Sequence, residues 1–172
     1  MEFSIGSGTL AEQSVDALIY GAGTGLEMDG DVGRSLRRAA SEPLAETASS
    51  DGSIGLGQVA VSDASELDAR YVIHAAAIPD HGNGEPSAAS VRAAMRNALH
   101  RADALDCESI ATTVLGANTA TYDHRKGARI VCETIDGYDP TAIEECRIVA
   151  SGSPEYDRLS LLADEVLSVP DY

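Results

Sequence analysis

The sequence predicts an α/β fold built on a mostly parallel β-sheet with both faces covered. Short apolar runs alternate with longer segments in which apolar residues recur at helical spacing, a pattern typical of parallel strands joined by crossover helices. The length of 172 residues lies in the range of one domain, so we expect a single domain over residues 1–172.

The expected elements follow from these two patterns. Six strands are predicted, at Phe3 to Ile5, Ala17 to Tyr20, Gln58 to Ser62, Tyr71 to Ala75, Ser109 to Val114 and Arg147 to Ala150. Four helices are predicted, at Asp31 to Ala40, Ala88 to Leu105, Tyr122 to Ile135 and Pro154 to Leu167. Ser87 is the expected N-cap of the second helix, because a Ser side chain can accept a hydrogen bond from the first turn.

The charge balance is strongly acidic. Asp and Glu number 28 against 12 Lys and Arg, a formal net charge of −16, and Lys126 is the only lysine. This composition resembles that of proteins from halophilic archaea, in which concentrated salt screens surface repulsion. An ordinary acidic protein of a mesophile is the alternative. The chain also lacks the basic stripe of a non-specific nucleic-acid binder, so we expect no direct contact with nucleic acid.

Other features narrow the class of protein. The three cysteines Cys107, Cys132 and Cys146 are widely spaced among apolar residues, which predicts reduced core residues, and no CxxC zinc pair occurs. No run approaches the roughly 20 apolar residues of a membrane span. We therefore expect a cytoplasmic protein with no membrane contact, no metal and no cofactor.

A glycine-rich stretch carries the strongest functional signal. Gly21 to Leu26 follows a predicted strand, and Glu27 to Gly33 leads into a helix that bears Arg34, Arg37 and Arg38. Glycine permits close backbone approach, so main-chain N–H groups there can converge on an anion at the positive end of the helix dipole. This pattern predicts a phosphate-binding site.

Three other interpretations of the stretch compete with a phosphate-binding site. A Rossmann motif requires GxGxxG, but here the third glycine, Gly25, falls one residue early and no helix follows at once. A P-loop needs GxxxxGK[ST], and the only lysine lies elsewhere. The third interpretation is a loop whose glycines only make turns.

Five segments in order resemble motifs of the macro domain family, over nearly the entire chain from Asp16 to about Leu167. They are Asp16 to Ile19, Asp29 to Gly33, Gly57 to Val61, Ala69 to His74, and Glu108 to Ala111 followed by Gly116 to Asn118.

The resemblance implies a three-layer α/β/α sandwich around a central mixed, mostly parallel sheet of six strands, with ADP-ribose in a cleft at the strand ends. Loop one, Asp29 to Gly33, is implied to approach the distal ribose and diphosphate, and loop two, Gly116 to Ala120, to close over the phosphates. The implied ligand-binding residues are Thr9, Leu10, Gly23, Asp29, Gly30, Asp31, Val32, Gly33, Gly116, Ala117, Asn118, Thr119 and Ala120.

Three positions depart from the family's pattern. The family's adenine-reading Asp falls on Thr9, and its two Asn residues fall on Tyr20 and Gly23. A Thr hydroxyl accepts a hydrogen bond from an amine more weakly than a carboxylate, and glycine has no side chain to hold a reacting water. The position after the last strand that can stack on adenine is small, at Ala150 or Ser151.

The leading functional hypothesis is therefore a binding module for ADP-ribose or a related nucleotide diphosphate, free or attached to protein. The second is a hydrolase of ADP-ribose 1″-phosphate, O-acetyl-ADP-ribose or mono-ADP-ribosylated protein, with Asp29 and Asp31 as candidate catalytic residues. The third is a macro fold without ligand that serves as an interaction module.

Several polar residues have simpler explanations. His74 at the end of an apolar strand is expected to be a core histidine. Asp80-His81 and Asp123-His124 are expected in solvated loops, because no third ligand is placed near either pair.

Overall fold

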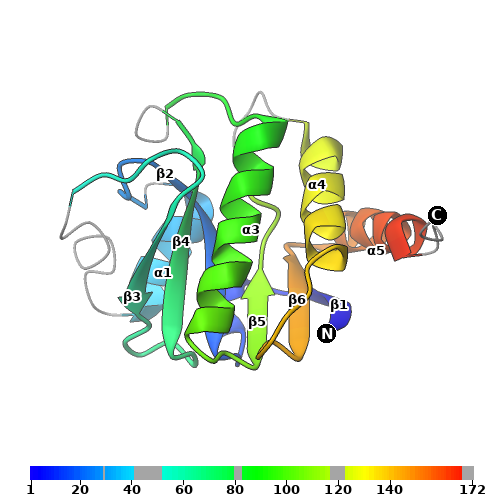
Figure 1. Cartoon of the computed structure of the whole chain (residues 1–172), viewed down its shortest axis with the longest axis horizontal. Helices are drawn as coiled ribbons and strands as arrows, with labels where there is room; N and C mark the ends of the chain where they lie inside the picture. The colour runs from blue at the N-terminus through cyan, green and yellow to red at the C-terminus, as the bar shows by residue number, and fades with distance from the viewer. Residues whose placement is uncertain (29, 41–51, 80–82, 117–122, 168–172) are drawn as a thin grey trace.

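The computed structural model describes residues 1–28, 30–40, 52–79, 83–116 and 123–167 (Figure 1). The strands are β1 (Glu2–Ser7), β2 (Ala17–Gly23), β3 (Val59–Asp63), β4 (Tyr71–Ile78), β5 (Ser109–Thr112) and β6 (Glu145–Ala150). The helices are η1 (Leu10–Glu12), a single 3-10 turn, and α1 (Asp31–Ala40), α3 (Ala88–Ala104), α4 (His124–Asp136) and α5 (Ser153–Leu167).

The described strands form one sheet in the order β1-β6-β5-β2-β4-β3. All neighbouring pairs are parallel except β3 and β4. Because β1, β6, β5 and β2 run in one direction, their carboxyl ends meet at one edge of the sheet. The predicted mixed, mostly parallel sheet of six strands is confirmed.

Helices cover both faces of the sheet, as the alternation along β2 shows. Ala17 and Ile19 belong to a core shared with α3, α4 and α5, whereas Leu18 and Tyr20 point to the opposite core, which contains Leu36 of α1. Figure 1 shows α3 and α4 in front of the sheet and α1 behind it. The implied three-layer α/β/α arrangement is confirmed.

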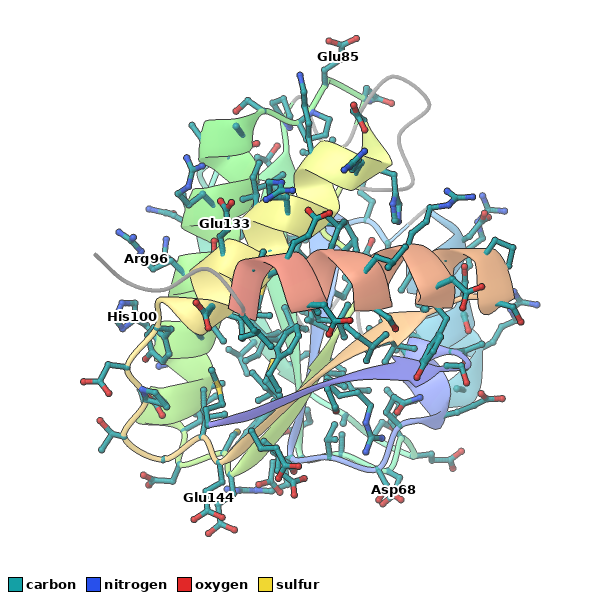
Figure 2. All side chains as sticks on the ribbon, turned by 90° about the vertical axis from the view of Figure 1, so that its right-hand side faces the viewer. Asp68, Glu85, Arg96, His100, Glu133 and Glu144 are labelled. Carbon is teal, nitrogen blue, oxygen red and sulfur yellow. The ribbon has the colours of Figure 1, made fainter. Side chains whose placement is uncertain are left out.

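Acidic side chains lie on the outside of this sandwich. Asp68, Glu85, Glu133 and Glu144 are exposed, and Asp68, Glu85 and Glu144 point away from the molecule in Figure 2. Among the described residues, no Asp, Glu, Lys or Arg is buried. The negative charge is therefore a surface property, on which salt in the solvent acts directly.

Several strands end at other residues than the sequence predicts, and the ends of β2 and β5 matter most for the site. β2 continues through Gly21, Ala22 and Gly23, which we expected to begin a loop, because β4 also runs longer and pairs with these residues across a register shift. β5 ends at Thr112 rather than Val114, where its pairing with β6 ends. Thr113 and Val114 are thereby released to the edge of the sheet.

Helix starts follow local side-chain chemistry. The Ser87 side chain accepts a hydrogen bond from the Ser90 N–H at 3.0 Å, so the predicted N-cap of α3 is confirmed. Asp123 is exposed, as expected, but it has a structural role as the N-cap of α4, and its carboxylate accepts from the Arg125 N–H at 2.9 Å. Asp80 and His81 lie outside the described residues.

Gly33 lets α1 pack closely on β2. A Cβ atom at this position would lie 2.8 Å from the Met28 carbonyl oxygen and 2.8 Å from the Tyr20 hydroxyl. Real Cβ atoms do not approach backbone so closely, so a side chain here requires α1 to shift. A Cβ at Gly30, three residues earlier, would meet nothing within 4 Å.

We predict that Gly33→Ala destabilises the fold by about 1–3 kcal/mol, the usual cost of overpacking, despite the better helix propensity of alanine. Urea unfolding followed by circular dichroism measures the loss. Gly30→Ala adds the same methyl group in open space and should cost clearly less. Equal stability of Gly33→Ala and the unmodified protein would show that α1 is not held by this contact.

His74 is a buried core histidine, as the sequence predicted. Its side chain is fully inaccessible, its Nε2 atom lies 2.9 Å from Ser62 Oγ, and the edge of its ring meets Tyr20 with centroids 6.0 Å apart. Its Nδ1 atom has no hydrogen-bond partner among the described residues. Burial lowers the pKa of His74 from 6.5 to about 4, because a charged ring would be desolvated there.

This shift predicts acid destabilisation with a defined window. The folded-state pKa lies below the unfolded value, so the unfolded chain binds the extra proton and stability is lost as pH falls from 6.5 towards about 4. The total loss is about 3 kcal/mol. The test measures the free energy of unfolding at several pH values between about 6.5 and 4. As the pH falls, this free energy should decrease less steeply for His74→Gln than for the unmodified protein, whereas the exposed control His100→Gln should follow the unmodified protein.

Candidate functional site

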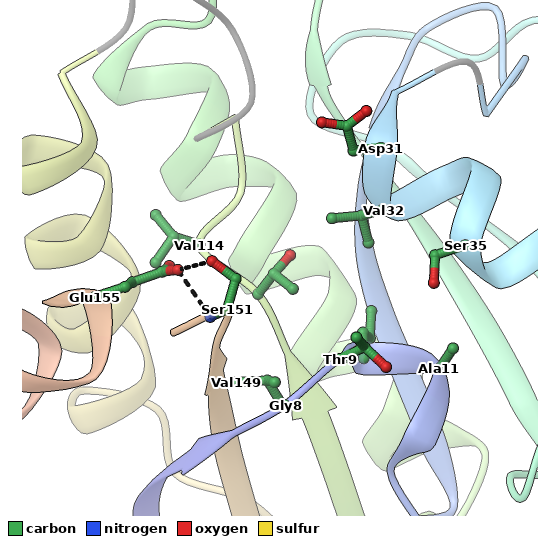
Figure 3. Close-up of a pocket in the computed structure, with 12 residues that line it drawn as sticks. Gly8, Thr9, Ala11, Asp31, Val32, Ser35, Val114, Val149, Ser151 and Glu155 are labelled. Atoms are coloured by element: carbon green, nitrogen blue, oxygen red, sulfur yellow. Dashed lines mark hydrogen bonds between the residues drawn. The ribbon is translucent and has the colours of Figure 1, made fainter. Parts of the chain in front are cut away.

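A pocket of about 270 Å³ opens at the carboxyl ends of β1, β5 and β6, next to the first turn of α1 (Figure 3). This volume is near the lower end of small-molecule sites, about 300–1,000 Å³. In open parallel sheets, ligands bind at this edge. The pocket is lined by Gly8, Thr9, Leu10, Ala11, Asp31, Val32, Ser35, Thr113, Val114, Val149, Ser151 and Glu155.

The first turn of α1 forms one side of the pocket. Asp31, Val32 and Ser35 contribute to its lining. The first N–H groups of a helix have no partner within the helix, and the helix dipole makes this end partly positive. This side of the pocket can therefore attract an anion through backbone groups.

Glu155 forms the opposite side, as Figure 3 shows. Its Oε2 atom accepts hydrogen bonds from the Ser151 N–H at 2.9 Å and the Ser151 hydroxyl at 2.5 Å. Its Oε1 atom lies 3.1 Å from His124 Nε2. The hydrogen bond with His124 is the main cause that lowers the pKa of Glu155 from 4.5 to about 2, with help from Ser151, so the carboxylate is ionised near neutral pH.

The pocket's own charges are negative. Among the residues that the structure describes, its lining contains the carboxylates of Asp31 and Glu155 and no Lys, Arg or His. Two unit charges 4 Å apart interact by about 4 kcal/mol at an effective dielectric constant of about 20. A phosphate next to the half-buried Glu155 would therefore be strongly disfavoured. Asp31 also places a carboxylate on the α1 side, but it is exposed and its charge is screened by solvent, so the backbone N–H groups of the first turn make the α1 side the better place for an anion.

The structure brings part of the predicted site together. Thr9, Leu10, Asp31 and Val32 line the pocket. Thr113 and Val114, which follow β5 and precede predicted loop two, line the same pocket as the start of α1. The start of α1 and the segment between β5 and predicted loop two therefore line one pocket, whereas no residue of loop two itself is in the described lining.

Other predicted residues lie beside the pocket rather than in its lining. Gly30 is exposed just before α1, and Gly33 is buried against Tyr20. Gly23 ends β2. Gly116 has a φ of 78° and its N atom would lie 3.2 Å from a Cβ on Gly21, so only a small residue fits at position 21. Asp29, Ala117, Asn118, Thr119 and Ala120 lie outside the described residues.

Sequence reasoning did not assign Glu155, Ser35, Thr113, Val114 and Val149 to the site. Ser151 was noted only as a small residue after the last strand. Thr113 and Val114 could have been found from the rule that ligands gather at the carboxyl ends of parallel strands. Glu155 gives no comparable signal, because the sequence does not show which side of the first turn of α5 faces the sheet edge.

The cysteines and possible metal ligands do not add chemistry to the pocket. Cys107, Cys132 and Cys146 are free and buried, as predicted. Burial raises the pKa of Cys132 to about 11, so its reactive thiolate form is suppressed. Within the described ranges, no group of three His, Cys, Asp or Glu residues could hold a metal ion, and no helix is long and apolar enough to cross a membrane.

Comparison with known proteins now identifies the family. The Macro domain family model matches residues 20–131. This chain belongs to the macro domain family. It is 30% identical over 159 residues to a macro domain-containing protein of Listeria monocytogenes, an alignment that covers 87% of this chain and 89% of that protein.

Solved macro domains share the fold. A mutant macrodomain of Oceanobacillus iheyensis with ADP-ribose aligns with a TM-score of 0.83 and 15% identity, over 97% of this chain and 93% of that one. A Trypanosoma brucei macrodomain in complex with ADP aligns with a TM-score of 0.80 and 19% identity, over 94% of this chain and 68% of that one. Relatives also occur in longer proteins: the chain spans 42% of a Mycobacterium tuberculosis protein to which it is 26% identical over 152 residues.

Proposed function

We propose that this macro domain binds ADP-ribose or a related nucleoside diphosphate, free or attached to a protein, in the pocket at the strand ends. The observation that carries the proposal is the convergence of the α1 start with the segment after β5 in one pocket. Two structural neighbours that hold ADP-ribose and ADP support the ligand class.

The proposed binding mode relies on neutral donors. The diphosphate would lie at the first turn of α1, where backbone N–H groups and the helix dipole stabilise negative charge. Gly116 to Ala120 are the proposed second phosphate loop on the basis of the sequence. Such a site gains affinity without the cationic side chains that a chain of net charge −16 largely lacks.

This mode predicts an unusual salt dependence. Ligand and protein are both negative, so raising KCl from about 0.1 M to about 1 M, which shortens the screening length from about 10 Å to about 3 Å, should tighten ADP-ribose binding severalfold. Calorimetry across the salt series measures this, with circular dichroism at each concentration to confirm that the domain is folded. Binding that weakens with salt would show that cationic side chains hold the phosphates.

Gly30 separates ligand binding from folding. Its Cβ direction is open, so Gly30→Glu should leave the fold intact. The new carboxylate would lie beside the start of α1 and repel the diphosphate, and we expect at least a tenfold loss of affinity for ADP-ribose, while Gly30→Ala keeps most of it. Unchanged affinity in Gly30→Glu would remove loop one from the site.

The Asp31 carboxylate favours hydrolysis of ADP-ribosyl bonds as the second candidate function. It is exposed at the start of α1 and lines the pocket, where it could hold a water molecule near bound ligand. If O-acetyl-ADP-ribose, ADP-ribose 1″-phosphate or mono-ADP-ribosylated protein is turned over, Asp31→Asn should lower the rate at least tenfold. The control variant Glu27→Gln removes an exposed charge just before α1, and we expect it to keep the turnover rate of the unmodified protein. Full turnover by Asp31→Asn would exclude this role.

A further inference from the structure

Glu155 is an unusual group to find in a pocket meant for an anionic ligand. It extends from the first turn of α5 to the pocket wall, opposite the start of α1 (Figure 3). The Ser151 N–H and hydroxyl hold one carboxylate oxygen, and His124 at the start of α4 contacts the other. Three elements thus fix the carboxylate in place before any ligand arrives.

The carboxylate retains capacity for one more hydrogen bond. An ionised carboxylate has about four acceptor positions and no donor. Among the described residues, two positions are used by Ser151 and one by His124. The remaining position can therefore take a hydrogen-bond donor from a molecule in the pocket, and it repels any acceptor.

The surroundings of Glu155 suit a flat, largely apolar group. Val114 and Val149 line the pocket as buried β-branched side chains, and Leu10 is buried in the same lining. Apolar walls with a single polar group at one end match a nucleobase, whose faces are apolar and whose edge carries the donors and acceptors. The phosphates are excluded from this end by the charge of Glu155.

Thr9 lines the pocket with a hydroxyl group, and among the described lining residues only Asp31 and Glu155 carry carboxylates. Glu155 supplies a carboxylate from a different element, α5.

We propose that Glu155 is the specificity-determining residue of this site, and that its carboxylate accepts a hydrogen bond from the exocyclic amino group of the bound base. This rests on the proposed function and names its base: a nucleoside diphosphate whose base carries an amino group there, as adenine does. A base with a carbonyl in that place, as hypoxanthine has, is rejected.

The test compares ADP with inosine diphosphate, which differs in replacing the amino group by a carbonyl. Binding of both is measured by calorimetry in about 1 M KCl for the unmodified domain, Glu155→Gln and the control Asp157→Asn. Asp157 is exposed on the same helix, so its variant removes the same charge away from the pocket. A third ligand, 2′-deoxy-ADP, reports on contacts to the ribose.

We expect the unmodified domain to prefer ADP over inosine diphosphate at least tenfold, since hydrogen bonds to charged groups contribute about 1.5–3 kcal/mol. Glu155→Gln should lose or invert this preference, because its amide can donate to the carbonyl, while Asp157→Asn should keep it. A merely structural role for Glu155 would weaken both ligands equally.

The other outcomes overturn the inference. Equal affinity for ADP and inosine diphosphate in the unmodified domain, or a preference that survives in Glu155→Gln, would show that Glu155 does not read the base. Glu155→Gln could instead weaken the binding of ADP and of inosine diphosphate by the same factor and leave the affinity for 2′-deoxy-ADP unchanged. This result would assign Glu155 to a contact with the ribose. The proposed function stands in each of these cases and fails separately if ADP and ADP-ribose do not bind at all.

Discussion

The shared direction of β1, β6, β5 and β2 is the constraint on which the rest of the structure depends. It brings the segments that follow these strands to one edge of the sheet, where Gly8, Thr113 and Ser151 line a single pocket although they lie far apart in the chain. Helix α1 adds its N-terminus because Gly33 lets it pack closely against Tyr20. The pocket therefore forms because parallel strands end at the same edge of the sheet and because α1 packs closely at Gly33, not because of a single sequence motif.

Charge shapes what such a pocket can do. A surface rich in Asp and Glu offers few cationic side chains to phosphate, and the described part of this pocket's lining contains none. Helix and loop N–H groups provide positive potential without changing the net charge of the chain. An acidic protein can therefore bind an anion when backbone N–H groups, here at the start of α1, contact the negative part of the ligand. Carboxylates such as Glu155 then face the part of the ligand that carries hydrogen-bond donors.

The sequence predicted the architecture well because the spacing of apolar residues along the chain differs between helices and strands. The bounds of α1 were predicted as observed, and the apolar alternation of β2 places its side chains correctly on two faces. The extension of β2 through Gly21 was missed, since strand pairing with β4 outweighs the low strand preference of glycine there. Glu155 was missed because its place in the pocket, across from Asp31 (Figure 3), depends on how α5 lies against the sheet.

The contacts of Tyr20 have a consequence for which amino acids this part of the core tolerates. The Tyr20 hydroxyl occupies the space that a Cβ on Gly33 would need, and the Tyr20 ring meets His74, which is itself paired with Ser62. Tyr20, Gly33, His74 and Ser62 therefore depend on one another, because a change at one position alters which amino acids fit at the others. A smaller residue at position 20 alone would leave a void beside the buried His74 imidazole, so such a change calls for a compensating change at a neighbouring position.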